Sequence, residues 1–155
     1  ELSPESLLRA SAPYLDAAGI SFVGHPNAAA AVHSVREKVS LLSELPTWGH
    51  YYFREDYPFD DDATAKLQAK PENKNLLQAV AVQLHMLTDW TEASFTAAIE
   101  SAAATEKVKP GAILPLLRFA LSGQTRGPNV ATIAHLIGKQ ATIQRIQRTL
   151  SEVLG

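Results

Sequence analysis

Residues 107–148 read KVKPGAILPLLRFALSGQTRGPNVATIAHLIGKQATIQRIQR, and this stretch decides the fold that we expect for the chain. Its apolar residues recur at helical spacing, and glycine and proline interrupt that spacing. Since proline favours helix starts and glycine favours helix ends, the stretch predicts short helices over 115–121 and 128–137 and an amphipathic helix after Gly138. No part of the chain alternates apolar and polar residues as strands do. The predicted fold class is therefore all-α, a bundle of short helices.

The same start and stop signals divide the rest of the chain into helices, with Ser3 as a helix cap and Gly19 and Pro46 as helix ends. The further helices that we expect cover residues 4–18, 27–45, 48–53, 63–68, 71–87 and 91–102. We expect two helical subdomains, residues 1–70 and residues 71–155, the second of which carries the basic stretch.

Three successive acids, Asp60, Asp61 and Asp62, precede the segment ATAKLQ. Acids at such a place accept hydrogen bonds from the free N–H groups of a helix start and favour its positive end. A metal ion that prefers oxygen ligands needs acids spaced so that they converge. We therefore expect the acids to cap a helix and to hold no metal.

Positive charge is concentrated near the C-terminus. From residue 107 onward the chain has seven lysines and arginines and one acid, Glu152, a charge of about +6. Residues 1–106 have seven basic side chains and fifteen acids, about −8, so the net charge of −2 conceals a polarised molecule. This asymmetry points to an anionic partner on the basic side, with nucleic acid as the first candidate.

Length and composition exclude several classes of protein. With 155 residues, 46% of them apolar, the chain is long enough to bury a core. No apolar run approaches the roughly 20 residues that span a bilayer, and no leader precedes the first helix, so we expect a soluble protein with no membrane partner. The absence of cysteine excludes disulfides and thiolate metal sites. We expect a cytoplasmic monomer.

Catalytic and metal-binding residues do not occur in a recognisable pattern. The five histidines never form HxxH or HExxH, and the apolar neighbours of His33 and His85 predict core or boundary histidines. The chain has no GxSxG, no GxxxxGK[ST] and no GxGxxG after a strand. We expect no catalytic residue, no metal and no cofactor within this chain.

A loop between two expected helices carries groups that suit RNA recognition. Proteins read unstacked bases by stacking and by hydrogen bonds from loops, while lysine and arginine hold the phosphates. Arg118, Gln124 and Arg126 supply such side chains, and Gly127-Pro128 makes a turn that exposes backbone groups. The positive end of the helix after Pro128 suits the same task. By composition alone, a solvated basic loop is an equally good interpretation.

Several segments resemble, in the same order, motifs of one known family. These segments are LSELP at 42–46, YFREDY at 52–57, DWTE at 89–92, VKPG at 108–111, LLRFALSG at 116–123, GP at 127–128 and LIGK at 136–139. They are similar to TLxELP, YxFxxDY, xWTE, VKxG, PLRxALTG, GP and LLGK of the C-terminal anticodon-binding domain of bacterial-type glutamyl-tRNA synthetases. The resemblance covers nearly all of the chain.

The resemblance implies an α-helical cage that embraces the anticodon of glutamate tRNA. It implies that Arg118 contacts an anticodon base, and that Gly127, Pro128 and Val130 read the middle and first anticodon positions. Lys38 occupies the place of the family's arginine that recognises the third base. A lysine keeps the charge but loses the planar bidentate fork, so the exclusion of glutamine tRNA does not follow from the resemblance.

The hypothesis that follows is a tRNA-binding fragment of a glutamate–tRNA ligase. A catalytic domain of the same parent chain would carry out ATP-dependent aminoacylation, and this fragment alone would be inactive. Two alternatives stay open: an all-α protein-interaction module, and a synthetase-like paralogue that passes glutamate to a non-tRNA acceptor. The RNA-binding residues expected are Lys38, Arg118, Gln124, Arg126, Gly127, Pro128 and Val130.

Overall fold

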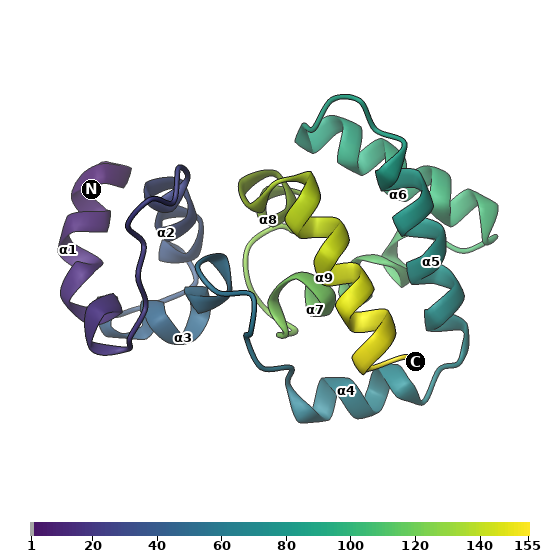
Figure 1. Cartoon of the computed structure of the whole chain (residues 1–155), viewed down its shortest axis with the longest axis horizontal. Helices are drawn as coiled ribbons and strands as arrows, with labels where there is room; N and C mark the ends of the chain where they lie inside the picture. Colours follow the sequence, from purple (N-terminus) through teal and green to yellow (C-terminus); the bar gives the residue numbers. More distant parts are fainter. Residues whose placement is uncertain (1) are drawn as a thin grey trace. The chain divides into compact units, whose positions relative to one another are not determined.

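The computed structural model describes residues 2–155, which form helices and connecting turns and contain no strand (Figure 1). The predicted all-α class is confirmed. The chain divides into two compact units, one that ends at Tyr57 and one that covers Pro58–Gly155. The compact units divide before residue 58, and the helical subdomains that we expect over residues 1–70 and 71–155 stay a prediction.

Over its described residues, 2–57, the first unit holds three α-helices and two short 3-10 helices. Its elements are α1 (Pro4–Ala17), α2 (Ala28–Arg36), η1 (Leu42–Glu44), α3 (Leu45–Gly49) and η2 (His50–Tyr52). Ser3 caps α1 as predicted, since its side chain accepts a hydrogen bond from the Ser6 N–H at 3.2 Å. Leu7 and Leu15 of α1 and Val35 of α2 are buried, so α1 packs its apolar face against α2.

The helix predicted over residues 27–45 is wrong in its second half, because α2 ends at Arg36. The Glu44 carboxylate accepts hydrogen bonds from the backbone N–H groups of Ser40 at 2.7 Å and Leu41 at 2.8 Å. These N–H groups would otherwise continue the helix, and the carboxylate directs them into the start of η1 instead. Lys38 consequently lies in a turn after α2 and not on a helix.

The second unit holds six α-helices and one short 3-10 helix. These are α4 (Asp61–Gln68), α5 (Glu72–His85), α6 (Glu92–Thr105), η3 (Pro110–Ala112), α7 (Leu114–Ser122), α8 (Val130–Ile137) and α9 (Lys139–Glu152). Helix α7 contributes more to the core than its length suggests, because every residue from Leu116 to Ser122 is buried except Arg118, which is half-buried. Helix α9 packs beside α5 and α7 (Figure 1), so the core of this unit forms around α7.

The acids at the start of α4 cap that helix, as predicted. The Asp60 carboxylate accepts a hydrogen bond from the Ala63 N–H at 2.9 Å, and Asp61 and Asp62 lie in the first turn. Within residues 2–155, no three His, Asp or Glu side chains gather as ligands for a metal ion. No helix of this described part is long and apolar enough to cross a membrane.

Candidate nucleic-acid interface

The loop of residues 123–129 connects α7 to α8, and local sequence signals fix both of its ends. Gly123 adopts a left-handed conformation with φ of +73°, and its N–H donates to the Phe119 carbonyl at 2.7 Å, which ends α7. The Asn129 side chain accepts a hydrogen bond from the Ala131 N–H at 2.9 Å and caps α8. Both helix boundaries agree with the sequence-based prediction to within two residues.

Buried polar groups hold the first part of this loop. The Ser122 hydroxyl donates to the Arg118 carbonyl at 2.6 Å and accepts from the Gln124 N–H at 3.1 Å. The Gly123 carbonyl accepts from the Asp60 N–H at 2.8 Å. The guanidinium of Arg145, which is only 2% exposed, donates to the Leu121 carbonyl at 2.6 Å. The chain therefore leaves α7 along a path that hydrogen bonds determine.

Arg118 holds the far end of the loop. Its Nη1 donates a hydrogen bond to the Pro128 carbonyl, and the side chain is half-buried. An arginine on α7 thus connects directly to the residue pair that precedes α8. The predicted contact of Arg118 with a base stays a prediction, and the structure shows that Arg118 joins the two ends of the loop.

The other predicted residues of the loop differ in exposure. Arg126 is exposed, Gln124 and Gly127 are half-buried, and Pro128 and Val130 are buried. The Val130 side chain belongs to the core, while its backbone lies at the start of α8. Gly127 has φ of +148°, a backbone conformation that glycine adopts at little cost and other residues rarely adopt. The loop therefore presents Arg126 and backbone groups outward and uses Pro128 and Val130 as anchors.

Lys38 lies in the first unit, whereas the other six predicted RNA-binding residues lie in the second. Its side chain is exposed in the turn that follows α2. Arg36 stabilises that turn, because its Nη1 donates to the Val39 carbonyl at 3.2 Å and the Val39 side chain is buried. This contribution of Arg36 could not be predicted from the sequence, since no pattern links an arginine to a carbonyl three residues onward.

Part of the positive charge counted in the sequence is used inside the protein. The Lys139 Nζ donates to the Leu87 carbonyl at 2.5 Å and to the His85 carbonyl at 2.9 Å, at the C-terminal end of α5. The Arg148 guanidinium lies 4.3 Å from the ring centroid of Phe59 and its Nε forms an ion pair with Glu152 at 2.7 Å. Fewer cations are therefore available to an anionic partner than the sequence count indicates.

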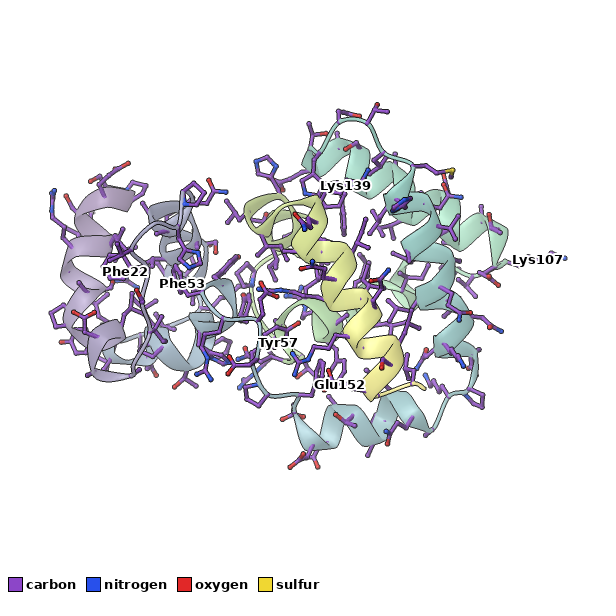
Figure 2. All side chains as sticks on the ribbon, viewed as in Figure 1. Phe22, Phe53, Tyr57, Lys107, Lys139 and Glu152 are labelled. Atoms are coloured by element: carbon purple, nitrogen blue, oxygen red, sulfur yellow. The ribbon has the colours of Figure 1, made fainter. Side chains whose placement is uncertain are left out.

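Lys107 is one of the cations that remain available to an anionic partner, since it is exposed and projects outward beyond the end of α6 (Figure 2).

The prediction that His33 and His85 are core or boundary residues is wrong, because both side chains are exposed. On α2, the buried stripe includes Val32 and Val35, and His33 faces away from that stripe although it is adjacent in sequence.

Comparison with known proteins relates nearly all of the chain to one group of proteins. The model of the anticodon binding domain family matches residues 6–150. A glutamate–tRNA ligase of Thermus thermophilus is 33% identical over 150 residues, which cover 97% of this chain and 31% of that protein. One of Geobacter sulfurreducens is 27% identical over 151 residues, 97% of this chain and 32% of its own length.

A solved structure has the same fold. It is the crystal structure of a glutamate tRNA ligase from Elizabethkingia meningosepticum CCUG26117 in complex with its amino acid, with a TM-score of 0.82 and 24% identity. The match covers 98% of this chain and 30% of that chain. The chain thus spans about a third of the length of the relatives that it matches.

Proposed function

This chain belongs to the anticodon binding domain family, and from that premise we propose that it binds the anticodon of glutamate tRNA. The observation that carries the proposal is the loop of residues 123–129, which is held at both ends and presents an exposed arginine beside the start of a helix. A loop of fixed shape loses little conformational entropy when it binds RNA. Its hydrogen-bonding groups stand at fixed positions, and the loop can therefore distinguish bases.

The residues of the loop have different parts in the proposal. Arg126 contacts a phosphate or the face of a base, while Gln124 and the backbone at Gly127 offer hydrogen bonds to base edges. Pro128 and Val130 are both buried, and they fix the backbone beside which a base lies. Arg118 keeps this surface in place through the Pro128 carbonyl.

Lys38 is proposed to contact the third anticodon base. The turn that carries Lys38 is held by the hydrogen bond from Arg36 to the Val39 carbonyl. A lysine donates from a single nitrogen, and it therefore discriminates among bases less strongly than a bidentate arginine.

The rest of the proposed activity belongs to the longer parent protein. Relatives of which this chain covers about a third are named glutamate–tRNA ligases. We infer that the parent chain uses ATP to attach glutamate to the tRNA that this part selects. The cytoplasmic location and the monomeric state stay predictions.

A fluorescence titration of the chain with glutamate tRNA tests the proposal. We expect binding that weakens as salt rises, and we expect Arg126→Ala to reduce the salt slope by about 0.7, the value for one phosphate contact to a single strand. Lys66→Ala is the matched control, because it removes one exposed cation on α4, outside the loop and outside the basic stretch. Excess free anticodon stem-loop should displace the tRNA from the unaltered chain. If the stem-loop does not compete, the anticodon is not the bound part.

A further inference from the structure

Most polar side chains around the loop already have partners inside the protein. The Ser122 hydroxyl bonds the Arg118 carbonyl, and the Asn129 side chain caps α8. The Thr132 hydroxyl donates to Glu92 Oε1 at 3.0 Å. These three side chains maintain the structure of the loop and its flanks, so they are unsuited to reading a base.

Thr125 differs from these residues. It lies between Gln124 and Arg126, directly after the anchored Gln124, and its side chain is exposed. Neither its hydroxyl nor its backbone N–H makes a hydrogen bond to any residue among residues 2–155. Thr125 therefore presents two unused polar groups from a loop whose path is otherwise fixed.

We propose that Thr125 is a specificity-determining residue, which hydrogen-bonds the edge of an anticodon base through its hydroxyl and its N–H. This inference rests on the proposed function and adds a residue to the same site. The hydroxyl both donates and accepts, while the N–H only donates, so together they match a base edge that presents an acceptor beside a second polar group. A base with the opposite arrangement leaves a donor unpaired, and that loss produces discrimination.

When a cation of the loop contacts a phosphate, it does not take the role in base recognition that we propose for Thr125. Contacts from arginine to phosphate position the RNA but carry no sequence information. Discrimination comes from hydrogen bonds to base edges, made by donors and acceptors at fixed places. The Gln124 N–H is already bonded to the Ser122 hydroxyl, whereas the N–H of Thr125 is available.

Thr125→Val and Thr125→Ser test the inference. Valine keeps the shape of threonine and removes the hydroxyl, while serine keeps the hydroxyl and removes the methyl group. Thr88→Val is the matched control, because Thr88 is also an exposed threonine outside the helices and without a hydrogen bond in the described chain. Each variant is titrated with the anticodon stem-loop of glutamate tRNA and with versions that carry one changed base at each anticodon position. Circular dichroism verifies that every variant is folded.

We expect Thr125→Val to lower discrimination at one anticodon position by about three- to tenfold, the range for one hydrogen bond. Thr125→Ser and Thr88→Val should discriminate as the unaltered chain does. Equal discrimination by Thr125→Val and the unaltered chain overturns the inference, as does a uniform loss against every anticodon. If the unaltered chain itself does not distinguish the anticodons, both the proposed function and this inference fail. If the unaltered chain distinguishes them and Thr125→Val distinguishes them equally well, only this inference fails.

Discussion

Arg118→Ala should lower the stability of the second unit as well as its affinity for RNA. The substitution removes the hydrogen bond from Nη1 to the carbonyl of the buried Pro128. A hydrogen bond from a charged group contributes about 1.5–3 kcal/mol. Because Arg118 is half-buried and water competes for its guanidinium, we expect a loss near or below the lower limit of that range, about 1–2 kcal/mol. For a chain of this size, that loss corresponds to a fall in Tm of about 2–8 °C.

The assay compares Arg118→Ala with Arg126→Ala by thermal unfolding and by hydrogen exchange of residues 123–129. Arg126 lies in the same loop and is exposed, so its substitution should change the free energy of unfolding by less than about 0.5 kcal/mol. Faster exchange in the loop should accompany only Arg118→Ala. Equal Tm values and equal exchange for the two variants would refute the conclusion that Arg118 anchors the loop.

Three further substitutions give separate outcomes. Lys38→Arg should increase the preference for glutamate tRNA over glutamine tRNA by about 1 kcal/mol or more, the lower limit for a bidentate contact. Competitive titration measures the ratio of the two affinities, and an unchanged ratio counts against a third-base role. Asp60→Ala should cost about 1 kcal/mol in chemical denaturation, since it removes the cap of α4, and Asp60→Asn should retain most of the stability; equal losses would show that charge and not capping matters. Gly127→Ala should cost about 1–3 kcal/mol because of the φ of +148°, and it should weaken RNA binding; a variant of normal stability and affinity contradicts that reasoning.

The helix boundaries that the sequence predicted correctly depend on local chemistry. Ser3, Asp60 and Gly123 act on residues within four positions, and their effects follow from the types of the residues. The boundary that it missed, at Arg36, depends on the Glu44 carboxylate turning back to the N–H groups before it. A helical pattern of apolar residues continues through that point, so periodicity alone cannot locate the break.

The candidate site could be predicted only in part, because its geometry depends on contacts between distant residues. The sequence located the loop and its cations. The sequence did not show that Arg145 is buried against the Leu121 carbonyl or that Lys139 hydrogen-bonds the end of α5. The number of cations available at the surface was therefore overestimated. Thr125 gains its importance only when the partners of the neighbouring polar groups are known.

One measurement tests the central claim most directly: the affinity of the chain for glutamate tRNA beside its affinity for the same tRNA with all three anticodon bases replaced. Both titrations are made at the same salt concentration, so that the contribution of the phosphates is equal. We predict tighter binding to the unaltered anticodon, by about tenfold or more, since each mismatched base costs on the order of 1 kcal/mol. Equal affinity for the two RNAs would contradict the assignment of this chain as an anticodon reader.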